Sequence, residues 1–173
     1  MNVLEAIQAR QSIRAYQPRE LEAAKLETIL QAANQAASAA NLQAYQIYIV
    51  RQQATKDALA AAAANQKFLA TAPVVLVFAT DGARSAVKFG QRGERVYAMQ
   101  DACAAVCNAM LAAVEVGLGT CWVDAVNEDA AGKAVQLPAS QRAAVLLPIG
   151  HPAEAPPRTT RRALSDLVTD LGR

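Results

Sequence analysis

A short run without a polar side chain places the strongest constraint on the fold of this chain. Every residue from Pro73 to Ala79 is apolar, over the length of one β-strand. A continuous apolar run of that length predicts a fully buried central strand. Residues rich in β-branched, aromatic or apolar side chains predict three more strands, at Tyr45–Val50, Thr120–Val123 and Ala143–Ile149.

Five segments place apolar residues at the spacing or length of helices. They are Asn2–Arg10, Glu20–Ala37, Thr55–Asn65, Val96–Val116 and Asn127–Val135. Glycines among mixed charges predict a mobile or solvent-facing loop at Asp81–Arg95, which could act as a lid. Helices and strands do not alternate strictly, so we expect an α+β fold. No linker divides the chain, so we expect one domain, residues 1–173, with a C-terminal arm over residues 153–173.

Composition limits the possible partners. The net charge is only +2, too small to favour nucleic acid or an anionic membrane as the main partner. Aromatic residues make up 5% of the chain and many apolar residues are alanine, so the core would gain from burial against a second subunit or a planar cofactor. We expect no transmembrane span and no signal peptide. Three sparse cysteines fit reduced thiols, which makes the cytoplasm the expected location.

The usual nucleophile and metal motifs are missing from the sequence. There is no G-x-G-x-x-G after a strand, no P-loop and no G-x-S-x-G. His151 is the only histidine, and Cys103 and Cys107 would supply only two metal ligands, so we expect no metal site and interpret both cysteines as small core residues. If the chain is an enzyme, a cofactor carries the chemistry and no side chain need be catalytic.

Two segments could contact a phosphorylated, ring-bearing cofactor. In Arg10-Gln11-Ser12-Ile13-Arg14, two guanidinium groups flank a hydroxyl, an arrangement that can surround a phosphate. In Ser38–Gln43, side-chain amides offer donors and acceptors that match the edge of a flavin or a nucleobase. Taken singly, the first segment is better interpreted as an exposed basic turn and the second as an ordinary polar loop.

Two later segments have the same ambiguity. Gly117–Asp124 turns a helix sharply into a strand and could aim Trp122 at a pocket, or it could be a tight turn with a core tryptophan. The arm carries Arg158, Arg161 and Arg162, which alone would be a solvated basic tail.

The order of these motifs is more specific than any one of them. R-x-S-x-R after an opening helix, S-x-x-N-x-Q before a strand, an Ala-Pro-apolar strand, G-L-G-T-C-W and G-H-P-x-E-x-P followed by R-R occur in sequence. In this order the chain resembles the nitroreductase family of FMN-dependent oxidoreductases over nearly its whole length. The resemblance implies an α/β sandwich with a central mixed sheet flanked by helices. It also implies an intertwined homodimer with two FMN sites at the interface.

The resemblance also implies which residues bind FMN. They are Arg10, Gln11, Ser12, Arg14, Ser38, Ala39, Asn41, Gln43, Lys67, Trp122, Val123, Asp124, Ala125, Arg161 and Arg162. Arg10 and Ser12 would face the phosphate, together with Arg161 or Arg162, while Arg14 and Lys67 would lie nearer the flavin ring. The backbone of Val123–Ala125 would pass flavin N5. Ser38, Ala39 and Asn41 would approach from the partner chain.

Several positions depart from the family pattern. Ala37 stands in place of a proline, Ala44-Tyr45 in place of Pro-Trp, and Asp124 in place of glycine. Thr159-Thr160 replaces the Lys-Pro before the arginine, which leaves open which arm arginine binds the phosphate.

The function implied by the resemblance is transfer of a hydride from NAD(P)H through FMN N5 to a small acceptor such as a nitroaromatic or a quinone, in a ping-pong cycle. The sequence does not choose between NADH and NADPH. One alternative is a flavin-binding protein with a storage or regulatory role and no turnover. A second is a phosphate- or nucleic-acid-binding module, which would be colourless and strongly salt-dependent in binding.

Overall fold

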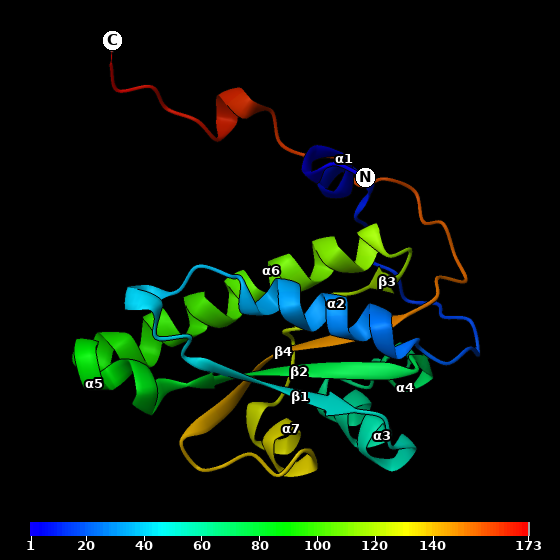
Figure 1. The fold of residues 1–173 in the computed structure, drawn as a ribbon, viewed down its shortest axis with the longest axis horizontal. Helices are drawn as coiled ribbons and strands as arrows, with labels where there is room; N and C mark the ends of the chain where they lie inside the picture. Colours follow the sequence, from blue (N-terminus) through cyan, green and yellow to red (C-terminus); the bar gives the residue numbers. More distant parts are fainter. Residues whose placement is uncertain (173) are drawn as a thin grey trace.

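A four-stranded sheet forms the centre of the computed structural model, which describes residues 1–172 (Figure 1). Its strands lie in the order β1-β2-β4-β3. Their bounds are Tyr45–Val50 for β1, Val74–Asp81 for β2, Gly119–Thr120 for β3 and Gln141–Gly150 for β4. Every residue of β2 from Val74 to Thr80 is buried, so the predicted buried central strand is confirmed.

The described strands pair only in antiparallel fashion, so the expectation of a mixed sheet is wrong for this chain. The connections explain the difference. Val50 at the end of β1 pairs with Val75 at the start of β2, so the link between them need not cross the sheet. The long helix after β2 then carries the chain back along the sheet before β3 (Figure 1). The one parallel pairing among the described residues is an isolated bridge between Ser12 and Thr120.

Helices cover both faces of the sheet (Figure 1). The α-helices are α1 (Val3–Ala9), α2 (Ala23–Asn34), α3 (Gln53–Ala62), α4 (Phe68–Thr71), α5 (Gly82–Arg92), α6 (Ala98–Glu115) and α7 (Glu128–Ala134). Short helical turns are η1 (Ala39–Asn41), η2 (Gly93–Tyr97) and η3 (Leu164–Asp166). Strand side chains alternate between two cores: Phe78 packs in the one beneath α2 and α6, and Val77 in the one beside α3, α4 and α7.

The segment Asp81–Arg95 is helical, so the prediction of a loop is wrong. The Asp81 side chain accepts a hydrogen bond from the Arg84 N–H at 3.1 Å and caps α5. Gly82 and Gly93 mark close packing, since a Cβ at Gly82 would lie 2.8 Å from Glu94 Cγ and one at Gly93 would lie 2.6 Å from Ser85 O. Only Gly90, with a φ of 55°, breaks the helical backbone here.

The strand predicted at Thr120–Val123 is shorter than expected. Only Gly119 and Thr120 pair with β4 as a strand. Val123 forms an isolated bridge with Leu146, whose N–H donates to Val123 O at 2.8 Å. The chain therefore leaves the sheet edge at Cys121 and returns at Val123. The short helix α4 was not predicted from the sequence.

Helix α6 packs along the sheet as a central helix of the core. The helical stretch Gly82–Glu115 is long and apolar enough to span a membrane by length and composition, and 44% of its most apolar window is buried. Fully buried residues of α6, among them Ala102, Val106 and Ala109, pack in the core against the sheet. Helix α6 is therefore a core helix. Cys107 on α6 is exposed, so the interpretation of this residue as a core residue is wrong for the single chain.

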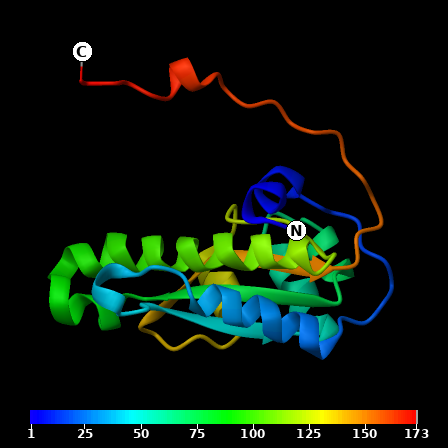
Figure 2. The same ribbon diagram turned by 45° about the horizontal axis from the view of Figure 1, so that its top comes forward.

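The N-terminal helix α1 and the described part of the C-terminal arm lie on the same side of the body (Figures 1 and 2). Helix α1 is capped by Asn2, whose side chain accepts a hydrogen bond from the Glu5 N–H at 3.0 Å in a capping box. The arm from Ala153 runs past α1 and ends away from the body, with η3 near its end. Apolar side chains on both are exposed, including Leu4 at 70% and Leu171 at 90%.

Candidate functional site

A cavity of about 490 Å³ lies where the start of the chain meets the C-terminal arm. The polar side chains around it come from two distant stretches of sequence. They include Arg10, Gln11, Ser12 and Arg14 from the first stretch and Arg158, Thr159 and Arg161 from the arm. Four guanidinium groups therefore surround one cavity, and no carboxylate of the described residues lines it. Such a cavity is suited to an anion with several oxygens.

The segment Arg10–Arg14 is held in an extended form beside β3. Helix α1 ends at Arg10, whose N–H donates to Ala6 O at 3.0 Å. The Ile13 N–H donates to Thr120 O at 2.9 Å, and the Ile13 side chain is buried. Because side chains alternate along an extended backbone, burial of Ile13 turns Arg10, Ser12 and Arg14 away from the core. The R-x-S-x-R spacing thus has a structural cause.

The arm is tied to this segment by backbone contacts that bring its arginines to the cavity. The Arg14 and Ala15 N–H groups both donate to Glu154 Oε1, the latter at 3.0 Å. The Ala153 N–H donates to Ala15 O at 2.9 Å. Further along, the Arg158 guanidinium donates to Gln8 O at 2.6 Å. Sequence reasoning missed Glu154 as an anchor, although its place in G-H-P-x-E was the available signal.

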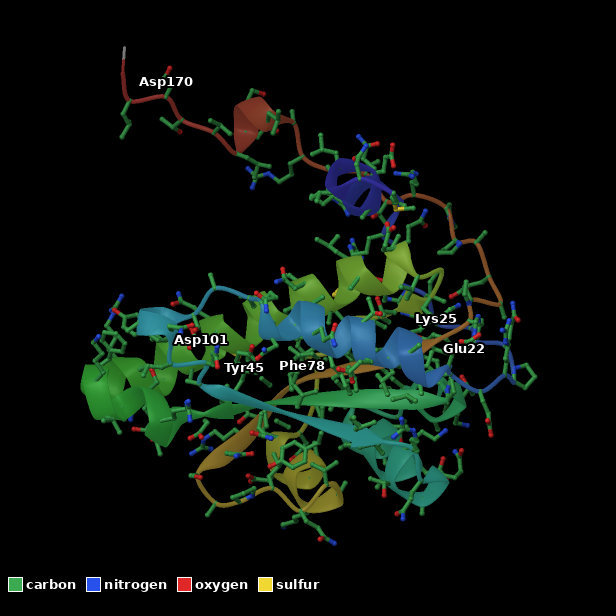
Figure 3. The ribbon with its side chains drawn as sticks, in the orientation of Figure 1. Glu22, Lys25, Tyr45, Phe78, Asp101 and Asp170 are labelled. Atoms are coloured by element: carbon green, nitrogen blue, oxygen red, sulfur yellow. The ribbon has the colours of Figure 1, made fainter. Side chains whose placement is uncertain are left out.

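A buried histidine supports the root of the arm. His151 is 6% exposed, and its Nε2 lies 2.9 Å from Glu22 Oε2. The backbone N–H of Glu22 hydrogen-bonds to the Glu22 carboxyl and lowers its pKa, and the contact with His151 lowers that pKa further. Figure 3 shows Glu22 at the start of α2, beside the place where the arm begins. His151 is thus a structural residue in this chain.

Arg14 also contacts Phe68, the first residue of helix α4. Its guanidinium carbon lies 5.9 Å from the centroid of the Phe68 ring, within the range of a cation–π contact. Lys67, the residue before Phe68, is exposed at the N-terminus of α4. Lys67 does not line the cavity, but this contact places it near the Arg14 end of the segment.

A buried thiol lies behind the segment. Burial raises the pKa of Cys121, while the positive charge of Arg14 and a hydrogen bond with Ser12 oppose that shift. Cys121 is 1% exposed. A buried thiol with a raised pKa is a poor nucleophile, so Cys121 packs behind the site without reacting in it.

The predicted turn residues lie outside the arginine cavity. Trp122 is half-buried against the core beneath α2 and α6, and Val123 is buried in the opposite core. Asp124 and Ala125 are exposed. None of these four residues lines the arginine cavity.

The loop Ser38–Gln43 lies at the other end of the molecule, beside α5 (Figure 1). The buried carboxylate of Asp101 organises it: Oδ1 accepts a hydrogen bond from the Ala39 N–H at 2.9 Å, and Oδ2 accepts one from the Ala44 N–H at 3.2 Å. Figure 3 shows Asp101 on α6 next to this loop. Sequence reasoning missed Asp101, because nothing near it in the sequence signals a contact with a loop 57 to 62 residues away.

The same loop has a strained backbone. Ala40, Asn41 and Gln43 have φ angles of 50°, 57° and 51°, in the left-handed region that non-glycine residues seldom adopt. The Gln43 N–H donates to Ser38 Oγ at 3.1 Å, which closes the loop on itself. Strain of this kind persists where surrounding contacts hold it, and it occurs often at ligand sites.

The two candidate arginines of the arm differ in their position relative to the cavity. Arg161 lines the cavity, whereas Arg162 does not and donates to Asp166 O at 2.7 Å. Arg158, which was not among the predicted site residues, also lines it. Within residues 1–172, no group of three or more His, Cys, Asp or Glu side chains could hold a metal ion.

Comparison with known families decides between the possible classes. The model of the nitroreductase family matches residues 7–67 and 60–151. This chain belongs to the nitroreductase family. The predicted family is thereby confirmed, and the matched region covers the Arg10–Arg14 segment, the Ser38–Gln43 loop and the Gly117–Asp124 turn.

Individual relatives agree with this assignment. The chain is 28% identical over 165 residues to the FMN reductase (NADPH) of Bacillus subtilis, with 88% of this chain and 66% of the relative covered. It is 30% identical over 162 residues to the NADPH-flavin oxidoreductase of Vibrio harveyi, covering 90% of this chain and 68% of the relative. The chain therefore spans about two thirds of the length of these two relatives.

A solved structure confirms the predicted fold class. The Vibrio harveyi NADPH:FMN oxidoreductase, solved in complex with NAD⁺, matches with a TM-score of 0.90 and 25% sequence identity. The match covers all of this chain and 78% of that chain. The chain thus has the α+β fold of the nitroreductases.

Proposed function

We propose that this chain is a cytoplasmic, homodimeric FMN oxidoreductase that passes a hydride from NAD(P)H to a small acceptor such as a nitroaromatic or a quinone. The observation that carries the proposal is the cavity in which Arg10, Ser12, Arg14 and Arg161 meet. In this account residues 1–173 form one FMN-binding domain, and the arm over residues 153–173 reaches the partner subunit.

The residues at the cavity fit FMN. The cavity volume of about 490 Å³ is in the range of small-molecule sites. The guanidinium groups supply donors for a phosphate, and Gln11 Oε1 is buried with no hydrogen-bond partner among the described residues. A buried acceptor without a donor is expected where a ligand completes the site. When bound, FMN supplies the ring nitrogen N5 that accepts and returns a hydride.

The chain's own residues then have positioning and electrostatic roles. Arg10, Ser12 and Arg161 bind the phosphate. Arg14 and Lys67 place positive charge near the pyrimidine side of the ring, where each could contribute about 1–3 kcal/mol to binding of the reduced anionic form. Residues Val123–Ala125 contribute backbone near N5. Because a cofactor does the chemistry, no acid–base side chain is required.

A second copy of the chain completes the site. Ser38, Ala39, Asn41 and Gln43 lie far from the arginine cavity in one chain (Figures 1 and 2). The exposed apolar residues of α1 and of the arm offer a surface for that copy, since contiguous exposed apolar area marks interaction sites. In the proposed dimer the Ser38–Gln43 loop approaches the FMN held by the partner's arginines.

Turnover distinguishes this proposal from a storage or regulatory role. Purified protein is mixed with FMN and NADPH or NADH, and oxidation of the nicotinamide is followed with menadione or nitrofurazone as acceptor. The proposal expects sustained oxidation and parallel lines in double-reciprocal plots, as a ping-pong cycle requires. A flavin-bearing protein that oxidises neither donor would favour the storage role.

A further inference from the structure

Helices α5 and η2 carry four exposed cationic side chains, which we call the α5 cationic cluster: Arg84, Lys88, Arg92 and Arg95. Among residues 1–172, none of the four lies within 4 Å of a carboxylate oxygen. Arg84 and Lys88 lie one turn apart on α5, where like charges destabilise a helix. The acidic residues of the same segment, Asp81 and Glu94, form no ion pair with these four cations among the described residues. The four cations therefore remain available to an external anion.

Aromatic rings hold two of these cations in place. The Phe89 and Tyr97 rings pack edge to face with centroids 5.0 Å apart. The Arg92 guanidinium lies 5.4 Å from the Tyr97 centroid, and its Nε donates to the Tyr97 hydroxyl at 2.9 Å. Lys88 Nζ lies 5.8 Å from the Phe89 centroid. The cations are thus positioned before any ligand arrives, which lowers the entropy lost on binding.

The cluster is joined to the proposed flavin site by a direct contact. Arg84 Nε donates a hydrogen bond to Leu42 O, in the middle of the Ser38–Gln43 loop. Figure 1 shows α5 beside that loop at one end of the molecule. In the proposed dimer this loop approaches the FMN, so the cluster lies at the rim of the same site and outside the arginine cavity.

We propose that the α5 cationic cluster binds the phosphates of the adenosine half of NADPH, and that its charge favours NADPH over NADH. This inference rests on the proposed function, because that reaction requires a nicotinamide dinucleotide to reach the flavin. The 2′-phosphate that distinguishes NADPH adds negative charge at the end of the molecule farthest from the nicotinamide. Cations at the rim contact that end while the nicotinamide occupies the flavin site. Arg92 and Tyr97 also provide flat faces against which an adenine can stack.

The test compares a variant that lacks two cations of the α5 cationic cluster with a control variant. Lys88→Gln/Arg92→Gln removes two cations and leaves Arg84 in contact with the loop. The control, Lys133→Gln, removes one exposed cation from α7, which packs on the sheet face opposite α6. Calorimetry measures the affinity of each FMN-loaded protein for adenosine 2′,5′-bisphosphate and for 5′-AMP. Steady-state assays give the KM values for NADPH and NADH.

The unaltered protein is expected to bind adenosine 2′,5′-bisphosphate more tightly than 5′-AMP. The double variant should lose about five- to tenfold in that affinity, from two exposed charge pairs, and its KM ratio of NADPH to NADH should rise by a similar factor. Lys133→Gln should change neither value.

The inference and the proposed function fail in different ways. An FMN-bearing, active protein whose double variant keeps its affinity for adenosine 2′,5′-bisphosphate and its KM ratio would overturn the inference alone. Binding of duplex DNA that is tighter than that of the bisphosphate and lost in the double variant would also overturn it. A protein that takes up no FMN and oxidises neither donor would overturn both.

Discussion

At the scale of single residues, the alternation of side chains along Arg10–Arg14 is the main determinant of the candidate site. Ile13 is buried against the edge of the sheet, and Gly119 leaves room for it. Arg10 and Arg14 therefore face the cavity together but at different ends of the segment. Arg14 contacts Phe68, whereas Arg10 follows directly on α1. This arrangement supports different roles for the two arginines.

Replacement of each arginine tests this division. Arg10→Ala should raise the Kd for FMN by about 10- to 100-fold, since a charge-assisted hydrogen bond contributes about 1.5–3 kcal/mol. Arg14→Ala should retain more FMN but lower the rate of flavin reduction, measured by stopped-flow absorbance. Arg162→Ala is the matched control, because Arg162 lies outside the cavity. If both cavity variants keep FMN and full activity, the assigned roles are wrong.

Asp101 is predicted to control the Ser38–Gln43 loop. In Asp101→Asn, one oxygen can still accept the Ala39 or Ala44 N–H, but the amide NH₂ faces the other donor. The expected loss is about 1–3 kcal/mol of unfolding free energy, measured by urea denaturation, together with weaker FMN binding. The exposed Asp57→Asn, whose side-chain oxygen can still accept the hydrogen bond from Gln53 Nε2 at 2.9 Å, should change neither. Equal effects of the two variants would argue against this role.

The residues that sequence reasoning found and those it missed differ in the range of their contacts. Arg10, Ser12 and Arg14 form a local pattern, and Arg161 follows a recognisable motif. Asp101 and Glu154 act on backbone groups 57 or more residues away, and such pairings depend on the tertiary fold. A single sequence carries no direct signal for them.

At the scale of elements, hydrophobic periodicity predicted the long helices, and a continuous apolar run predicted the buried strand β2. Glycine was less informative. Gly82 and Gly93 suggested a loop, yet both are needed because neighbouring chain segments pack against them. Periodicity also missed α4, which is a single helical turn of four residues between α3 and β2. Short elements depend on packing more than on pattern.

Gly119 is predicted to set the distance between β3 and the Arg10–Arg14 segment. A Cβ in Gly119→Ala would lie 2.8 Å from Ile13 Cβ and Cγ1. Overpacking of this kind should destabilise the fold by about 1–3 kcal/mol and weaken FMN binding, because the segment must shift. Gly132→Ala in α7 is the control: its Cβ would lie 3.8 Å from Leu137 Cδ1, and it should stabilise the helix by up to about 1 kcal/mol. Thermal unfolding and FMN titration measure both, and a Gly119→Ala variant as stable as the parent would contradict the packing argument.

At the scale of the whole molecule, the two parts of the predicted FMN site do not meet within a single chain. The Ser38–Gln43 loop lies away from α1 (Figure 2). The arginine cavity is lined from the start of the chain and from the arm, and exposed apolar residues lie on α1 and along the arm. The sequence alone suggested a partner through its small core and the family resemblance. The division of the site gives an independent physical reason to expect one.

Removal of residues 156–173 tests the role of the arm. The truncated chain keeps Glu154 and both cores, so its thermal unfolding should remain cooperative. It loses Arg158 and Arg161 and the apolar residues of the arm, so FMN affinity should fall by about 10-fold or more and the dimer should weaken. Light scattering after size exclusion measures the dimer. A truncated chain that keeps the mass and FMN content of the full chain would contradict this role.

The proposed function depends on FMN binding in the cavity between Arg10–Arg14 and the arm. The most direct measurement is the visible spectrum of the purified protein after addition of FMN and removal of the excess, followed by anaerobic addition of NADPH or NADH. We expect flavin absorption bands with one FMN per chain, and their bleaching by at least one donor. A protein that stays colourless, or a bound flavin that neither donor reduces, would contradict the account.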